Sequence, residues 1–125
     1  MATPDTQRIA LCASAALVDG GLAVAFEVCH RGQNLRAFAV RFEGRVQAYL
    51  NRCTHVAMEM DLREGHFFDD SGCLLICASH GAVFAPDTGE CLGGPARGPL
   101  VKVVVSEEAG TVYWHTAPDL HPVAF

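Results

Sequence analysis

The chain has 125 residues, of which 50% are apolar and 18% charged, a composition typical of one folded domain and unlike that of a disordered chain. Its formal net charge of −5 argues against nucleic acid and anionic membrane as partners, because both bind basic surfaces. We therefore expect a single domain over residues 1–125.

The compartment follows from what the sequence lacks. No apolar stretch approaches the roughly 20 residues of a membrane helix. The opening "MATPDTQRIA" has no basic segment leading into an apolar run, as a secretory signal would. We expect a cytoplasmic protein, whose six cysteines are thiols, metal ligands or catalytic groups and not a disulfide framework.

The local pattern predicts an all-β domain. Gly and Pro separate short segments that alternate in polarity or are rich in β-branched and aromatic residues. Turn residues such as "EG" at 43–44 join neighbouring segments tightly. The expected strands are 22–28, 35–42, 45–50, 100–105 and 111–115.

One strand shows which of its faces should be buried. In 35–42, alternate residues point to opposite faces, and Arg36, Phe38, Val40 and Phe42 form the bulkier set. We expect this set to face inward. The first eight and last eight residues show no comparable pattern and are expected to be peripheral.

Two pairs of Cys and His lie in a loop-rich segment across residues 51–97. Cys53 and His55 stand two positions apart in "NRCTHV", and Cys77 and His80 stand three apart in "CASHG". Residues at either spacing can reach one metal ion around a loop or tight turn. Glycine after the second pair permits close backbone approach. We expect two metal-binding loops, joined by a hairpin of the apolar runs 67–68 and 73–77.

The ligand types leave three alternatives. Two thiolates and two imidazoles can hold a tetrahedral zinc ion, although zinc modules seldom open with Cys-x-His. They can equally hold a two-iron cluster in which one iron takes both thiolates and the other both imidazoles. Such a cluster explains why each loop carries one ligand of each type. The third alternative is that the cysteines are core residues and the histidines incidental.

The flanking residues resemble those of Rieske [2Fe–2S] proteins, over roughly residues 35 to 114. "GRVQAYLNRCTH" is similar to the family's strand into the first loop, and "HGAVFAPDTGECLGGPARGPL" to its second loop and the segment that folds over the cluster. The resemblance implies a Rieske-type antiparallel β-sandwich base with an inserted cluster-binding subdomain at 51–97. It also implies that Cys53 and Cys77 bind the inner iron of a [2Fe–2S] cluster, while His55 and His80 bind the outer iron.

The sequence departs from the family pattern at three places. The spacer from residue 56 to residue 76 has 21 residues, more than is usual, so the intervening hairpin should be longer. Ala78 stands where Pro is common, and Ala57 where Gly often follows the first His. These changes affect loop geometry and remove no ligand.

The resemblance narrows the class of Rieske protein. Respiratory subunits carry a membrane helix and two further loop cysteines, where Met58 and Ser79 stand here. Ring-hydroxylating oxygenases add a large mononuclear-iron domain, for which residues 81–125 leave no room. We expect an electron carrier that is not itself an enzyme, and the resemblance implies a stand-alone, monomeric ferredoxin.

The implied partners are a flavin-dependent reductase as electron donor and a terminal oxygenase of the ring-hydroxylating type as acceptor. An alternative function is the Rieske-like small subunit of a nitrite reductase or another multi-subunit reductase. Ala82 and Phe84 stand where high-potential relatives carry hydroxyl donors. We therefore expect a reduction potential in the lower part of the Rieske range, which spans about −150 to +300 mV overall.

Charged and sulfur-containing residues outside the pairs give weaker signals. The spacer has five acidic residues, which form either a solvated hairpin or a docking surface for a basic partner: Glu59, Asp61, Glu64, Asp69 and Asp70. The remaining cysteines are expected to be core or strand thiols: Cys12, Cys29, Cys73 and Cys91. His66 lies in the spacer without a Cys partner, and Trp114 is expected in the framework core.

Overall fold

A computed structural model describes residues 7–52, 65–69, 71–77, 81–94 and 99–123. The expected all-β class is confirmed, because the described residues contain eleven strands, one short 3₁₀ helix and no α-helix. Within these ranges no helix has the length and apolar character to cross a bilayer. The elements are β1 (Arg8–Ala13), η1 (Ser14–Ala16), β2 (Val24–His30), β3 (Gln33–Phe42), β4 (Arg45–Leu50), β5 (Leu75–Ile76), β6 (Val83–Phe84), β7 (Cys91–Gly93), β8 (Lys102–Val103), β9 (Val105–Glu108), β10 (Thr111–His115) and β11 (Leu120–Pro122).

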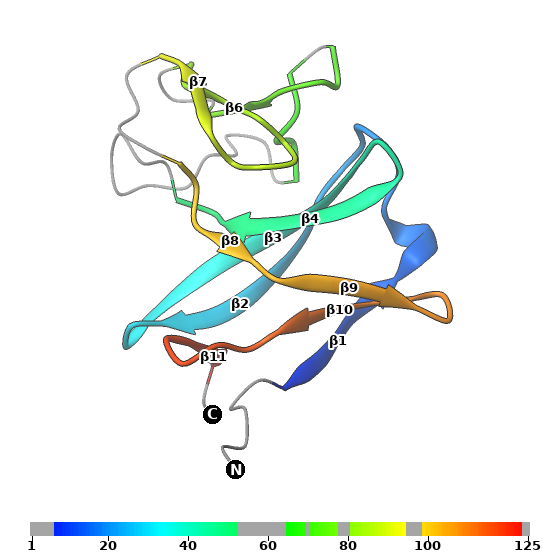
Figure 1. Ribbon diagram of the computed structural model, residues 1–125, viewed down its shortest axis with the longest axis vertical. Helices are drawn as coiled ribbons and strands as arrows, with labels where there is room; N and C mark the ends of the chain where they lie inside the picture. The colour runs from blue at the N-terminus through cyan, green and yellow to red at the C-terminus, as the bar shows by residue number, and fades with distance from the viewer. Residues whose placement is uncertain (1–6, 53–64, 70, 78–80, 95–98, 124–125) are drawn as a thin grey trace.

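The strands form three antiparallel sheets (Figure 1). The largest has the order β11-β2-β3-β4-β8, and a second has the order β1-β10-β9. These two make the base of the molecule. The third, β5-β6-β7, is small and lies above the base at the upper end in Figure 1.

Tight two-residue turns join the long strands of the base. Glu43 and Gly44, between β3 and β4, have φ values of 51° and 80°, the left-handed geometry of a type I′ turn. This turn matches the right-handed twist of the paired strands. It fixes the register in which Phe42 faces Arg45, as the "EG" pair predicts.

The five-stranded sheet is buried on both faces, which differs from the expectation of a single inward face. Phe38 and Val40 of β3 pack in one apolar cluster, which also contains Cys77. Ala37 and Ala39, on the opposite face, are equally inaccessible and pack in a second cluster around Trp114. The small alanine side chains allow the second sheet to approach closely. Trp114 therefore lies in the framework core, as expected.

The spacer hairpin is present between the two apolar runs. Phe68 bridges to Leu75, and the backbone N–H of Ile76 donates to the carbonyl of Phe67 at 2.8 Å. The turn at its end is closed by Asp69, which accepts a hydrogen bond from the Ser71 hydroxyl at 2.6 Å. That bond lowers the pKa of the Asp69 carboxyl.

Two expectations about the chain's C-terminal part were wrong, and one strand was not predicted. Residues 100–105 form two strands, because β8 pairs with β4 in one sheet and β9 pairs with β10 in the other. The last eight residues are not merely peripheral, since β11 pairs with β2 at the edge of the large sheet. A strand that the sequence did not indicate, β1, pairs with β10 from Arg8 onward.

Arg41 ties three parts of the base together. Its guanidinium donates to the Glu107 carboxylate on β9 at 3.1 and 2.6 Å. It also donates to the carbonyls of Leu17 and Ser14, in the segment after β1, at 2.8 and 3.1 Å. The bonds from Arg41 to the carboxylate lower the pKa of Glu107. Together, the hydrogen bonds of Arg41 fix the connection between β1 and β2 against both sheets.

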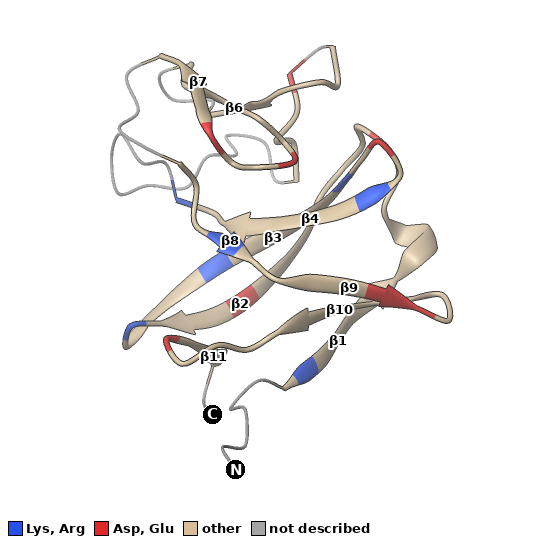
Figure 2. Ribbon diagram, in the orientation of Figure 1, with Lys and Arg blue, Asp and Glu red and all other residues tan. Residues whose placement is uncertain are grey.

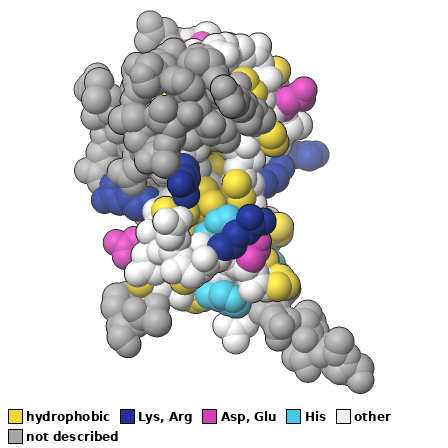
Figure 3. Space-filling model, turned by 90° about the vertical axis from the view of Figure 1, so that its left-hand side faces the viewer, with side chains coloured by type: hydrophobic (Ala, Val, Ile, Leu, Met, Phe, Trp, Pro, Cys, Tyr) yellow, Lys and Arg dark blue, Asp and Glu magenta, His cyan; other side chains and the backbone are white. Residues whose placement is uncertain are grey.

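Charges are mixed on the side of the base that bears the turn from β2 to β3. Figure 3 shows basic, acidic and histidine side chains next to one another on this face. Asp119 pairs there with His30 at 3.6 Å and with Arg31 at 3.5 Å. The described side chains of this face therefore carry both signs of charge.

Candidate metal centre

Cys77 is the one predicted ligand within the described residues. It follows β5 directly, its side chain is fully buried, and it belongs to the apolar cluster between the small sheet and the base. Cys53, His55 and His80 lie outside the described ranges, as do Ala57, Met58, Ala78 and Ser79. Among the described residues alone, no group of three or more metal-binding side chains comes together.

Two backbone hydrogen bonds join the ends of the second Cys/His loop. The backbone N–H of Cys77 donates to the carbonyl of Ala82 at 2.8 Å, and the N–H of Gly81 donates to the carbonyl of Cys77 at 2.9 Å. Gly81 has a φ of +75°, a left-handed conformation that glycine adopts at little cost. Cys77 and Ala82, the two ends of the loop, are therefore held together, with the sequence "ASHG" between them.

The backbone of Gly94 packs against the end of this loop. A Cβ built at position 94 would lie 2.6 Å from the Ala82 Cα and 3.1 Å from the Gly81 carbonyl oxygen. Real Cβ atoms do not approach backbone atoms this closely, so only glycine fits. The sequence resemblance implies that the Gly-Pro-Ala segment at 94–96 folds over the cluster, and of this segment only Gly94 is described. That residue lies against the loop's end.

The approach to the first loop is fixed by the large sheet. At the end of β4, the backbone N–H of Leu50 donates to the carbonyl of Val101 at 2.9 Å, and that of Asn51 donates to the carbonyl of Arg36 at 2.8 Å. The Arg52 side chain donates to the Gln33 side chain at 3.3 Å. The chain is therefore held in place up to the residue before Cys53.

Aromatic residues fill the space between the small sheet and the base. The rings of Phe38 and Phe67 stack with centroids 3.7 Å apart, and Tyr49 lies beside Phe38 at 6.0 Å. Phe84 is also fully buried in this cluster. These rings and Cys77 belong to one buried apolar cluster. The sequence indicated buried rings in β3, but not the pairing of Phe38 with the spacer residue Phe67.

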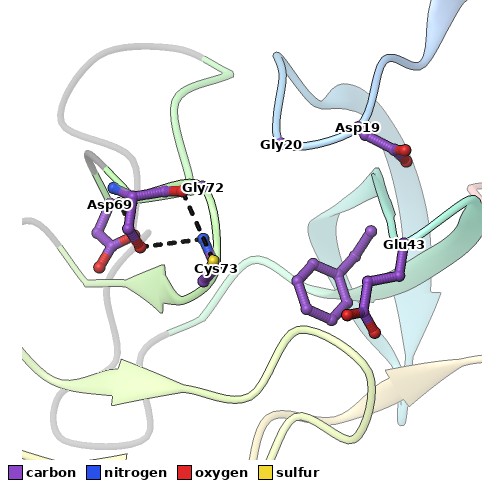
Figure 4. Close-up of a pocket in the computed structure, with 8 residues that line it drawn as sticks. Asp19, Gly20, Glu43, Asp69, Gly72 and Cys73 are labelled. Atoms are coloured by element: carbon purple, nitrogen blue, oxygen red, sulfur yellow. Dashed lines mark hydrogen bonds between the residues drawn. The ribbon is translucent and has the colours of Figure 1, made fainter.

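An acidic cleft separates the spacer hairpin from the base (Figure 4). It has a volume of about 400 Å³ and carries three carboxylates, from Asp19, Glu43 and Asp69. Asp69 and Cys73 lie on its spacer side, while Asp19 and Glu43 lie on its base side. Of the five acidic spacer residues, Asp69 alone is described. A docking surface formed by all five stays a prediction.

The described cysteines and histidines outside the predicted ligand set occupy several parts of the fold. Cys12 and Cys29 are partly buried strand residues, as expected, whereas Cys73 is exposed in the spacer turn, contrary to the expectation of a core or strand thiol. Cys91 begins β7 and packs against the same apolar cluster as Cys77. His66 is exposed. His115 contacts the Ser106 hydroxyl at 2.8 Å on the second sheet.

The model of the Rieske [2Fe–2S] domain family matches residues 7–109. The chain belongs to this family. The matched range includes β1 to β9 and both Cys/His pairs, and it ends before β10 and β11. No curated protein matches the sequence significantly.

Solved Rieske structures share the fold. The Sphingomonas yanoikuyae B1 ferredoxin is 25% identical with a TM-score of 0.65, and the match covers 85% of this chain and 95% of that one. The ferredoxin of carbazole 1,9a-dioxygenase from Nocardioides aromaticivorans IC177 is 22% identical with a TM-score of 0.69, covering 90% and 98%. The terminal oxygenase of the same system is 17% identical with a TM-score of 0.70, covering 94% of this chain but 32% of that one.

The residues of this Rieske domain fit the family's cluster. Cys77 supplies a thiol that is shielded from water, in a loop whose ends are fixed by backbone hydrogen bonds. The chain also carries a second thiol and two imidazoles, arranged in the sequence as a Cys-x-His and a Cys-x-x-His pair. Ala82 and Phe84, both fully buried, offer no side-chain hydroxyl next to the loop. The cofactor of the family is thus matched by the donors present, without the hydroxyl donors of high-potential members.

Proposed function

We propose that Cys53, His55, Cys77 and His80 are the cluster ligands, with both cysteines on one iron and both histidines on the other. The buried position of Cys77, in a loop whose ends are fixed, is the structural observation that supports this assignment. A thiolate and an imidazole from each loop satisfy both irons, so all four protein ligands are accounted for. When bound, the cluster accepts and releases one electron.

We propose that the protein is a one-electron carrier for a ring-hydroxylating oxygenase system. The match with the Sphingomonas ferredoxin extends over 95% of that chain, while the oxygenase match extends over 32% of the oxygenase. The fold therefore corresponds to the ferredoxin as a whole and to one part of the oxygenase. No catalytic side chain is assigned, because the proposed role requires only that the cluster be held and reached.

A terminal oxygenase is the proposed electron acceptor. Related ferredoxin folds occur in structures described as complexes of oxygenase and ferredoxin in carbazole 1,9a-dioxygenase. A flavin-dependent reductase is the proposed donor, and the cytoplasm the proposed compartment. Encounters of this kind use small interfaces, below roughly 1,200 Å². A monomer is the simplest carrier that can present one cluster to both partners.

A matched pair of variants tests the ligand assignment. Cys77→Ser removes a proposed thiolate, while Cys91→Ser changes another cysteine that packs against the same apolar cluster. We expect Cys77→Ser to lose the cluster iron and sulfide and Cys91→Ser to retain both. Retention of the cluster by Cys77→Ser, with the same spectrum as the unmodified protein, would contradict the assignment.

Electron transfer is tested with purified components. NADH and the flavin reductase of a carbazole dioxygenase system should bleach the visible spectrum of the oxidised protein. Adding the oxygenase of that system should restore the spectrum as electrons pass on. A cluster that dithionite reduces, but that exchanges no electron with either component, would exclude these two classes of partner.

A further inference from the structure

Two residues paired on neighbouring strands of the large sheet donate hydrogen bonds to consecutive carbonyls of the β6–β7 turn. Tyr49 on β4 and Lys102 on β8 are register partners in the antiparallel ladder. The Tyr49 hydroxyl donates to the carbonyl of Pro86 at 2.8 Å, and the Lys102 ammonium donates to the carbonyl of Asp87 at 2.9 Å. Figure 2 shows the basic segment of β8 below the β6–β7 turn that it holds.

The Tyr49 side chain is enclosed by this turn. It is fully buried, and a Cβ at Gly89 would lie 2.7 Å from its Cε1 atom. The turn backbone therefore rests directly on the edge of the ring. Burial raises the pKa of the phenol well above its usual range, so the hydroxyl stays protonated and remains a donor.

The turn is itself well ordered by backbone bonds. The N–H of Ala85 donates to the carbonyl of Glu90 at 2.9 Å, and the N–H of Gly89 donates to that of Ala85 at 2.8 Å. The carbonyl of Gly89 accepts from the N–H of Leu100 at 2.8 Å, just before β8. The turn therefore moves as a unit, and anchoring it anchors the β6–β7 hairpin.

The two anchored elements carry the two ligand loops. β4 ends at Leu50, three residues before Cys53, and β6 begins at Val83, directly after the loop from Cys77 to Ala82. Tyr49 thus joins the strand entering the first loop to the hairpin leaving the second. We propose that Tyr49, assisted by Lys102, is a positioning residue that fixes the two ligand loops relative to each other. This inference rests on the proposed cluster site.

The separation of the two cores makes the role measurable. Tyr49 belongs to the cluster that contains Cys77, whereas Trp114, the single tryptophan, belongs to the cluster on the other face of the large sheet. Visible absorbance of the bound cluster reports the ligand loops. Trp114 fluorescence reports unfolding of the base. A positioning residue should affect the first signal and leave the second unchanged.

The test compares Tyr49→Phe with Tyr113→Phe in the cluster-loaded protein. Tyr113 lies on β10 in the other sheet, with Arg8 over its ring at 4.1 Å. Loss of one buried hydrogen bond should make opening of the loops about five- to tenfold more favourable. We expect Tyr49→Phe to lose visible absorbance about five- to tenfold faster than Tyr113→Phe in chelator. Its Trp114 signal should change at the unmodified rate, and the EPR lines of its reduced cluster should broaden.

Each remaining result decides against one of the two proposals. Equal bleaching of the two variants, or a Tyr49→Phe variant whose bleaching and Trp114 signals accelerate together, would overturn the positioning role. Absence of iron and sulfide from the unmodified protein would instead overturn the cluster site. A second pair of variants serves if Tyr49→Phe does not fold: Lys102→Met, with Arg45→Met as the control for lost charge. Lys102→Met must then lose visible absorbance about two- to threefold faster than Arg45→Met, since an exposed hydrogen bond contributes less to stability than a buried one. Equal rates would overturn the positioning role.

Discussion

The backbone of Gly94 lies so close to Ala82 that a Cβ at position 94 would stand 2.6 Å from the Ala82 Cα. Gly94 also has a φ of +85°, in the left-handed region. The loop that begins at Cys77 ends at Ala82, so this contact determines where the loop can lie. A side chain at position 94 would displace the loop or the segment that carries Gly94.

Gly94→Ala is therefore expected to destabilise the cluster loop. The left-handed backbone alone costs roughly 1–3 kcal/mol for a residue with a side chain, and the backbone clash adds to it. Iron content after purification and the thermal midpoint of the visible absorbance should both fall. Gly93→Ala is the matched control, because a Cβ there would meet only the Val83 side chain, at 3.4 Å. Equal losses in the two variants would show that the Gly94 contact has no special role.

Stability of the base should depend on pH through Glu107. Hydrogen bonds from Arg41 lower the pKa of this carboxyl below its ordinary value in the folded protein. The ionised carboxylate therefore stabilises the fold above the ordinary pKa, and this contribution is lost as the pH falls through the lowered value. Between pH 6 and pH 3 the free energy of unfolding should decrease by about 1 kcal/mol less in Glu107→Gln than in the unmodified protein.

Glu108→Gln provides the control for this titration. Glu108 pairs with Arg8 at the surface, and its side chain is 68% exposed, compared with 31% for Glu107. Exposed pairs of this kind contribute little. Chemical denaturation at each pH, followed by Trp114 fluorescence, measures all three proteins. An unchanged pH dependence in Glu107→Gln would refute the stabilising role of the pair.

The reduction potential should respond to a hydroxyl at position 82. Ala82 is fully buried at the end of the Cys77 loop, and it has no side-chain donor. A hydroxyl that donates to a cluster or cysteine sulfur stabilises the reduced form, which carries one more negative charge. Stabilisation by about 1.4 kcal/mol raises a one-electron potential by about 60 mV. Spectroelectrochemistry of Ala82→Ser should show a rise of this order.

Ala85→Ser is the corresponding control, since Ala85 follows Phe84 and lies in the β6–β7 turn. The same substitution at that position should leave the potential unchanged. A potential for Ala82→Ser equal to that of the unmodified protein would mean that residue 82 does not face the sulfurs.

Local patterns predicted the strands whose turns and alternation are strong. The Glu43–Gly44 turn fixed the expectation for β3 and β4, and the structure has both strands at or close to the predicted bounds. The burial of both faces of β3 was not predicted, because Ala37 and Ala39 carry too little apolar surface to indicate a buried face. Their burial depends on the second sheet, which pairs residues about 100 positions apart, such as Arg8 with His115.

The candidate site was predicted by its ligand types and spacing, whereas its supports were not. Cys77 could be recognised from the pairing of Cys with His along the chain. The contacts of Gly94 with Ala82 and of Tyr49 with Pro86 join residues 12 and 37 positions apart. Neither contact leaves a periodic pattern in the sequence. The first contact forms where β6 pairs with β7 within the small sheet, and the second forms only when the small sheet packs on the base.

EPR of the dithionite-reduced protein, with iron and acid-labile sulfide counted on the same sample, tests the central claim most directly. We expect a rhombic signal with the low average g value of an imidazole-ligated cluster, and two iron and two sulfide per chain. An EPR-silent protein that holds one zinc per chain and no sulfide would contradict both the proposed ligands' role and the electron-carrier function.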